Sequence, residues 1–296
     1  MAAEAPEPLR PLTRPLPLAP GAGLGPSVRL GPVTLVVSNL RRALSFYAGF
    51  LGLWMHRVDE GTAALGAGDE DLVLLVEDPD APPAIDCTGL FHLALLVPSR
   101  RELAHSLQRL IYARMPLTGF ADHLVCESIY LNDPDGNGIE IYADRPPEEW
   151  PLDDGHVQMA TDPLDLYYVL TSATGRSLPP EQLEVGTVIG HVHLRVADTD
   201  AAEAFYRDAI GLDVMARWER SSVLAAGGYH HHIGVNHAAS AGAPPAPPWA
   251  LGMRQFELVV ADLDSVRARL GPEAERADGG LDAVDPSGNR ILVRAG

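Results

Sequence analysis

One stretch of this chain occurs twice, and this repeat constrains the fold more than any other feature. Residues 31–53 (GPVTLVVSNLRRALSFYAGFLGL) reappear as residues 190–212 (GHVHLRVADTDAAEAFYRDAIGL) at a constant offset of 159. An internal repeat at such long spacing indicates duplicated structural units. The second copy has His191 where the first has Pro32. A functional site is therefore expected where one unit carries an imidazole that the other lacks.

Each copy predicts a strand followed by a helix. Val33, Leu35 and Val37 alternate with other residues as in a half-buried strand, and the apolar residues after them recur at helical spacing. Residues 89–110 and 252–270 have the same order, and each stretch is followed by an Asp-Pro turn that leads into an alternating strand. The sequence therefore predicts four strand–helix–strands units in series.

Length and charge limit the class of protein. A chain of 296 residues can bury two domains of two units each. The net charge of −18 argues against nucleic acid or an anionic membrane surface as a partner. Two cysteines are too few for a disulfide framework, and no apolar run is long enough to span a membrane. We expect a cytoplasmic protein with a small-molecule ligand, and whether it forms a homo-oligomer is left open.

Composition also predicts the domain boundaries. Residues 1–27 are rich in Pro and Ala, which is typical of a disordered arm. Two domains of two units each are expected at 28–145 and 189–296. The stretch 146–188 between them is interpreted as a linker.

Three motifs resemble the vicinal oxygen chelate superfamily, which includes glyoxalases, bleomycin resistance proteins and extradiol dioxygenases. They are ESIYLNDPDGNGIEIYADRP (127–146), GHVHLRV (190–196) and GGYHHHIGVN (227–236). The resemblance extends over about residues 30 to 295 and is greatest to the four-unit bacterial catechol 2,3-dioxygenase type. It implies an α+β fold in which four βαβββ units pair into two open barrels.

The resemblance also implies that metal ligands lie on the first and last strands of paired units. Unit two carries His92 on its first strand and Glu140 on its last, and unit three carries His191 on its first. The outer units have Pro32 and Gln255 at the first-strand position, so both are expected to lack a metal. Because the ligands are divided between units two and three, we expect these two to share one barrel, and units one and four to share the other.

Two imidazoles and one carboxylate that leave open positions suit non-haem Fe(II), with Mn(II) as the nearest substitute. The expected function is extradiol cleavage of catechol or a substituted catechol with O2, an oxidoreductase reaction of aromatic hydrocarbon catabolism. The alternatives are a metal-dependent lyase or isomerase of the glyoxalase kind, a thiol transferase of the fosfomycin-resistance kind, and a metal-free binding module. The binding module would leave the three ligands without a use.

A histidine run in unit three supplies the predicted acid/base group. Ring cleavage needs a side chain that takes a proton from the diol. His230 and His232 are expected to share one face of a strand, and His232 is predicted to be this base, with His230 as the reserve. Alignment of the units places His232 opposite Glu140, so metal binding by His232 would favour a glyoxalase-like enzyme.

Two further side chains are implied by the resemblance to contact the substrate. Tyr130, ten residues before Glu140, is expected to donate a hydrogen bond to the substrate or to bound oxygen. His123 is expected to bind a substrate hydroxyl. His193 shares the strand face of His191 and is an alternative metal ligand in its place.

Overall fold

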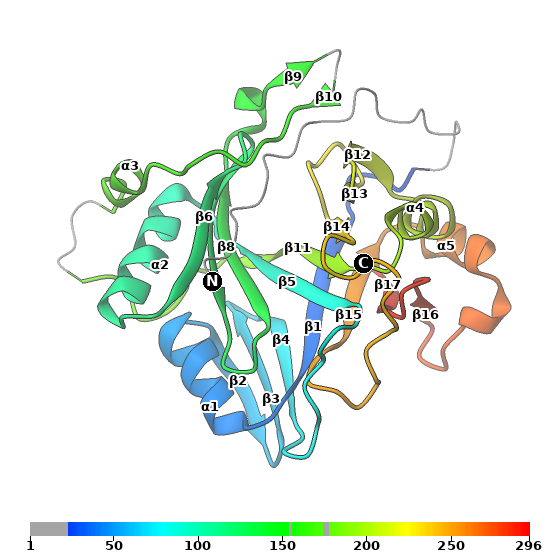
Figure 1. Cartoon of the computed structure of the whole chain (residues 1–296), viewed down its shortest axis with the longest axis horizontal. Helices are drawn as coiled ribbons and strands as arrows, with labels where there is room; N and C mark the ends of the chain where they lie inside the picture. The colour runs from blue at the N-terminus through cyan, green and yellow to red at the C-terminus, as the bar shows by residue number, and fades with distance from the viewer. Residues whose placement is uncertain (1–22, 154–155, 174–177) are drawn as a thin grey trace.

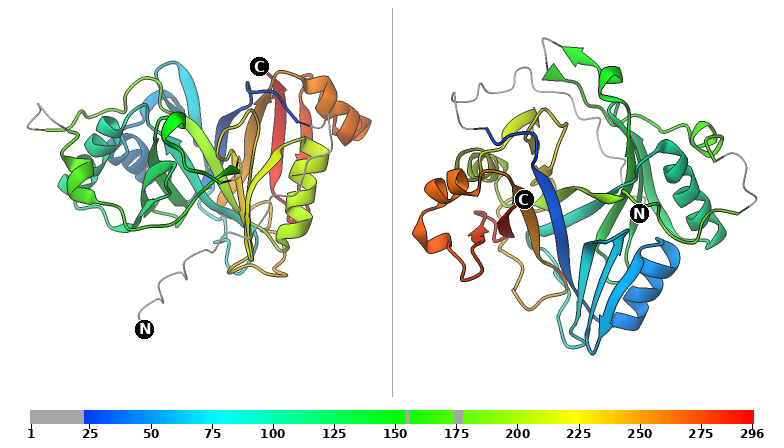
Figure 2. Two further views of the ribbon diagram at one scale, coloured as in Figure 1. Left: turned by 90° about the horizontal axis from the view of Figure 1, so that it is seen from above. Right: turned by 180° about the vertical axis from the view of Figure 1, so that it is seen from behind.

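A computed structural model describes residues 23–153, 156–173 and 178–296. Two curled sheets lie against each other, and the helices α1, α2, α4 and α5 cover their outer faces (Figure 1). Both further views place α2 and α5 at opposite ends of the molecule (Figure 2). No helix in these described ranges is long and apolar enough to cross a membrane.

Units one and four form a seven-stranded sheet in the order β16-β17-β15-β1-β4-β3-β2. Unit one consists of β1 (Arg29–Val37), α1 (Leu40–Leu44), η1 (Ser45–Phe50), β2 (Trp54–Asp59), β3 (Thr62–Ala67) and β4 (Glu70–Glu77). Unit four consists of β15 (Gly252–Val260), α5 (Leu263–Leu270), η4 (Pro272–Ala274), β16 (Leu281–Val284) and β17 (Arg290–Ala295). Unit four departs from the predicted βαβββ pattern, because the segment after α5 begins with the turn η4 and makes only one isolated bridge, from Glu275 to Leu281.

Units two and three form an eight-stranded sheet in the order β12-β13-β14-β11-β5-β8-β7-β6. Unit two consists of β5 (Gly89–Leu96), α2 (Arg100–Tyr112), β6 (Leu117–Asp122), β7 (Cys126–Asn132) and β8 (Gly138–Asp144). Unit three consists of β11 (Val188–Arg195), α4 (Thr199–Ala204), η3 (Phe205–Ile210), β12 (Asp213–Trp218), β13 (Ser221–Ala225) and β14 (Ile233–Asn236). The predicted pairing of unit two with three, and of unit one with four, is confirmed.

The same buried hydrogen bond joins consecutive units in both halves of the chain. The Tyr47 hydroxyl donates to Asp133 Oδ2 at 2.9 Å, and the Tyr206 hydroxyl donates to Asp285 Oδ2 at 3.1 Å. Each tyrosine belongs to the repeated stretch, and each aspartate opens the Asp-Pro turn of the following unit. The repeat therefore duplicates the contact between units as well as the units themselves.

The stretch between the two halves packs against the first half. It contains η2 (Pro147–Glu149), β9 (Leu152–Asp153), β10 (His156–Val157) and α3 (Leu166–Leu170). The Leu183 N–H donates to the Gly52 carbonyl at 2.8 Å, and Trp54 Nε1 donates to the Leu183 carbonyl at 3.0 Å. Trp150, Val157 and Met159 pack on a small buried cluster at the concave face of β5, β7 and β8. This segment thus packs on unit one and on strands of unit two in the eight-stranded sheet.

The predicted N-terminal arm lies mostly outside the described residues, which begin at Gly23. Leu24 is buried, and its N–H donates to the Gly211 carbonyl at 3.1 Å. Pro26 lies against Gly227, where a Cβ would come within 2.2 Å of the proline backbone. The last residues before β1 are therefore packed against unit three.

Candidate metal centre

Three polar side chains converge at the middle of the eight-stranded sheet. His92 lies on β5, Glu140 on β8 and His191 on β11. Ala94 is the direct strand neighbour of both Glu140 and His191, and His92 lies two residues from Ala94 on the same face. Because Ala94 carries only a methyl group, the three longer side chains can meet above it.

The distances between the three groups fit one bound ion. Glu140 Oε2 lies 2.9 Å from His92 Nε2 and 3.0 Å from His191 Nε2, and the two Nε2 atoms are 3.2 Å apart. Donors held at right angles around an ion at about 2.1 Å stand about 3 Å from each other. The Nδ1 of His191 is buried without a hydrogen-bond partner among the described residues. The residues present therefore fit a divalent metal bound on one face.

Electrostatics favour the metal-binding form of Glu140 and of His191. Burial alone would raise the pKa of Glu140, but the hydrogen bonds and charges of His191 and His92 hold it well below its usual value. Burial lowers the pKa of His191 to about 4, which the neighbouring carboxylate opposes only in part. At neutral pH Glu140 is thus a carboxylate and His191 a neutral imidazole, the forms in which both bind metals.

A local two-fold relates the two central strands of this sheet. In the antiparallel pair β5 and β11, His92 lies opposite His193, and Ala94 lies opposite His191. Rotation by the local two-fold places His191 at the position of His92, and His193 at the position of Ala94. His191 is therefore the histidine that joins the ligand cluster, whereas His193 lies beside it.

The same symmetry identifies the position that would supply a second carboxylate. Glu140 lies beside Ala94 in the parallel pair β5 and β8, and Gly234 lies beside His193 in the parallel pair β11 and β14. A Cβ at Gly234 would come within 2.9 Å of the His193 ring, which fills this space. The alignment that placed His232 opposite Glu140 was wrong by two residues, because the loop before β14 differs from the turn before β8.

The histidine run lies in a loop and not in a strand, which corrects the expected alternation of its side chains. β14 begins only at Ile233. His232 Nδ1 accepts a hydrogen bond from the Ala226 N–H at 3.3 Å. The ring centroids of His231 and His191, in contrast, lie 4.0 Å apart. No role was predicted for His231, yet its ring is the one in this run that lies closest to the ligands.

His231 is linked to the edge of the sheet through His230. The two Nδ1 atoms lie 2.6 Å apart, so one of them carries a proton and donates to the other. His230 Nε2 bonds Asp144 Oδ1 at 2.7 Å, and Asp144 also accepts the Tyr229 hydroxyl at 3.0 Å. Because Nδ1 of His231 is used in this chain, its Nε2 is the atom left for other contacts.

Tyr130 and His123 form a pair on the other side of the cluster. His123 Nε2 and the Tyr130 hydroxyl are 2.7 Å apart, and His123 Nδ1 donates to the Ala160 carbonyl at 2.6 Å. The Tyr130 ring lies 5.7 Å from that of His92. Burial and the charge of Glu140 raise the pKa of Tyr130 well above its usual value, so its hydroxyl remains a proton donor at neutral pH.

The centre opens on the side of His92. Two rings beside His191 are buried, whereas three rings beside His92 are exposed or half-buried. The buried neighbours are His231 and Tyr142, Phe91 is exposed, and Tyr130 and His193 are half-buried. A small molecule would therefore approach the ligands past His92.

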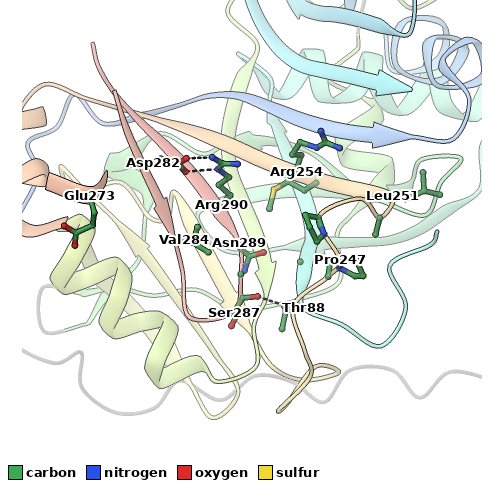
Figure 3. A pocket seen from close by; sticks show the side chains of 16 residues that line it. Thr88, Pro247, Leu251, Arg254, Glu273, Asp282, Val284, Ser287, Asn289 and Arg290 are labelled. Carbon is green, nitrogen blue, oxygen red and sulfur yellow. Dashed lines mark hydrogen bonds and ion pairs between the residues drawn. The ribbon is translucent and has the colours of Figure 1, made fainter. Parts of the chain in front are cut away.

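A hollow of about 510 Å³ lies where β15, β16 and β17 meet the loop before β15 and the start of β5 (Figure 3). Its Asp282 is bonded to Arg290, and Thr88 Oγ1 donates to the Ser287 carbonyl at 2.6 Å. Two groups of side chains in the described chain could hold a metal. His92–Glu140–His191 lies on the eight-stranded sheet, and Cys126–Asp144–His230 lies on β7, β8 and the loop before β14. Neither group lines the hollow.

Comparison with known proteins points to the same fold. The family model described as the glyoxalase/bleomycin resistance protein/dioxygenase superfamily matches residues 29–141 and 188–293. A Bacillus subtilis (strain 168) protein named catechol-2,3-dioxygenase is 39% identical over 272 residues, which cover 87% of this chain and 93% of that protein.

Two solved structures illustrate the likeness in fold. Glyoxalase I from Zea mays superposes with a TM-score of 0.53 at 15% identity, over 90% of this chain and 92% of that one. The CppA protein of Streptococcus pneumoniae TIGR4 superposes with a TM-score of 0.53 at 11% identity, over 90% of this chain and all of that one. At such low identity, these likenesses describe the fold alone.

Proposed function

The chain belongs to the glyoxalase/bleomycin resistance protein/dioxygenase superfamily, and on this premise we propose that it is an extradiol dioxygenase that cleaves catechol or a substituted catechol with Fe(II) and O2. The observation that carries the proposal is the ligand set of two imidazoles and one carboxylate on one face. Such a set leaves several positions of a non-haem iron open for two reactants. The name of the Bacillus subtilis relative supports the same reaction.

His92, Glu140 and His191 would hold the ferrous ion. When bound, the iron supplies the redox chemistry that joins the diol to O2. The diol itself must give up a proton, and a positioned imidazole contributes about 10² to 10⁴ in rate to such a step. We assign this role to Nε2 of His231, in place of His232, because the His231 ring lies against His191 while the Nδ1 of His232 accepts a backbone N–H.

His230 and Asp144 hold the imidazole of His231 in place. The bond from His230 to His231 fixes the ring orientation, and the carboxylate of Asp144 fixes His230 in turn. The side chain of Asp144 reaches the surface, so a proton taken from the diol can leave along this chain. On the open side, the Tyr130 hydroxyl donates its single proton to Nε2 of His123, which fixes its orientation. We therefore assign Tyr130 to accept a hydrogen bond from a substrate hydroxyl, in place of the donation expected from the sequence.

The main alternative is a metal-dependent lyase, isomerase or thiol transferase of the glyoxalase and fosfomycin-resistance kind. Such sites tend to use a fourth ligand from the last strand of the partner unit. Gly234 stands at that position here and carries no side chain. The dioxygenase needs no fourth ligand, and Mn(II) is its nearest alternative ion.

Anaerobic reconstitution tests the proposal. The protein is loaded with Fe(II) without air, then mixed with catechol in aerated buffer, and formation of the yellow ring-fission product is followed. We expect turnover with Fe(II) and none with His191→Ala treated in the same way. Isomerisation of a glutathione hemithioacetal, with no cleavage of catechol, would instead support the hypothesis of a glyoxalase-like enzyme.

A further inference from the structure

The strand that carries His92 has an irregularity beside the metal centre. In the pairing of β5 with β11, His193 lies opposite His92, but the next residue, Leu194, lies opposite Leu90. Phe91 and His92 thus share one partner, which is the arrangement of a β-bulge. Bulges re-aim side chains, and this one brings the Phe91 ring within 5.3 Å of the His92 ring and 5.2 Å of the His193 ring.

Arg195 holds the bulge in position. A bulge interrupts the ladder and leaves a backbone group without its strand partner. The Leu90 carbonyl accepts two hydrogen bonds from Arg195, one from Nε at 3.1 Å and one from Nη2 at 2.8 Å. Because the guanidinium is used to fix this carbonyl, the position of Phe91 is set by the fold and does not depend on a flexible loop.

The ring of Phe91 stands at the accessible side of the centre. Phe91 is 49% exposed, whereas the adjacent ligand His92 is only 7% exposed. The rings of Phe91, His92 and His193 lie 5.0 to 5.3 Å from one another and form a continuous aromatic wall. A small molecule that reaches the ligands past His92 must cross this wall.

We propose that Phe91 is the platform against which the substrate ring packs, and that it makes the enzyme select catechols with apolar substituents over catechols with a carboxylate. The inference rests on the function proposed above. An aromatic wall rewards an uncharged ring, because stacking and burial of apolar area act together. The net charge of −18 adds a field that repels an anionic diol.

Substrate binding to the iron-loaded protein without air tests the platform. The dissociation constants of 4-methylcatechol and 3,4-dihydroxybenzoate are measured by calorimetry for the wild type, Phe91→Ala and Phe91→Tyr, together with iron content. Wild type should bind 4-methylcatechol at least about ten-fold more tightly than 3,4-dihydroxybenzoate. Phe91→Ala should weaken 4-methylcatechol about ten-fold, since loss of a stacked ring costs about that much. Phe91→Tyr should restore most of the affinity.

Tyr167→Ala is the matched control, because Tyr167 is an exposed aromatic residue on α3 and should change neither dissociation constant. Unchanged affinity in Phe91→Ala, or equal affinity of the wild type for both diols, would overturn the inference while leaving ring cleavage intact. Loss of iron from Phe91→Ala would also overturn it, because the residue would then support His92. A wild type that binds neither diol and cleaves no catechol would refute the proposed function itself.

Discussion

The two sheets of this protein are built alike, yet the ligands of the proposed iron site lie in only one of them. At the centre of the eight-stranded sheet, β5 and β11 carry His92 and His191. At the centre of the seven-stranded sheet, Thr34 lies opposite Gln255, and Leu292 occupies the last-strand position that corresponds to Glu140. The same backbone thus carries polar ligands in one sheet and none of them in the other.

Some contacts occur in both halves of the chain, and others occur in one half only. The bonds from Tyr47 to Asp133 and from Tyr206 to Asp285 occur in both, and each joins one unit to the next. The ligand histidines and Glu140 occur once. Features that survive duplication in both copies therefore hold the units together, and features found in one copy mark the site.

The largest effect is expected from removing a ligand. Glu140→Ala and His191→Ala should each lose bound metal and, with it, essentially all catalytic activity, because two remaining ligands cannot hold the ion. The fold should survive, since the barrel is held by buried apolar strand faces. Metal analysis and circular dichroism check both points. Gln255→Ala, the matched change in the other sheet, should keep full metal content, and a loss there would break the comparison.

Removal of His231 should cost rate but not metal. His231→Ala is expected to lower kcat about 10² to 10⁴-fold at unchanged iron content, because it deletes the assigned base while leaving all three ligands. His232→Asn, which keeps an acceptor for the Ala226 N–H, should lose far less. Steady-state kinetics on samples of known iron content compares the losses of kcat in the two variants. A larger loss in His232→Asn than in His231→Ala would assign the base to His232.

Acid should destabilise the metal-free protein through His232. Burial lowers the pKa of His232 to about 4 from 6.5, so the unfolded chain binds more protons between these values. The free energy of unfolding should fall as the pH drops from about 6.5 to about 4, by about 3 kcal/mol from this residue, and its share should be constant above that range. Urea titrations of wild type and His232→Asn measure the difference, and equal slopes with pH would contradict it.

The hydrogen bonds donated by Tyr47 and Tyr206 should contribute similar amounts to the free energy of unfolding. Tyr47→Phe and Tyr206→Phe each delete a hydroxyl that donates to a buried aspartate, and each is expected to lower the free energy of unfolding by about 2 kcal/mol. Denaturant unfolding compares them, with metal content as the control. A large loss in one variant and none in the other would show that the duplicated bond has kept its role in only one half.

Much of the fold could be predicted because the sequence contains an internal repeat. The repeat defines the units, and the division of His92, Glu140 and His191 between units two and three indicates how the units pair. Alternation of side chains along β5 places His92 and Ala94 on one face, as the structure has them.

The features that could not be predicted depend on where each strand ends and on the register between neighbouring strands. The periodicity of two applies only inside a strand, and Gly227 and Gly228, both at positive φ, hold the histidine run in a loop before β14. Strand alternation applied to this run therefore predicts His232, and not His231, as the base. The bulge at Phe91 depends on the register between β5 and β11, which neither strand determines alone. Among its described residues, unit four has a turn beginning at Pro272 where the pattern predicts a strand.

Diffraction from crystals of the Fe(II)-loaded protein, measured at the iron absorption edge, tests the contrast between the sheets most directly. We expect one anomalous peak per chain, enclosed by His92, Glu140 and His191, with nothing near Gln255 or Leu292. A peak in the seven-stranded sheet, or full iron content with no peak between these three side chains, would contradict the assignment of the metal to the eight-stranded sheet.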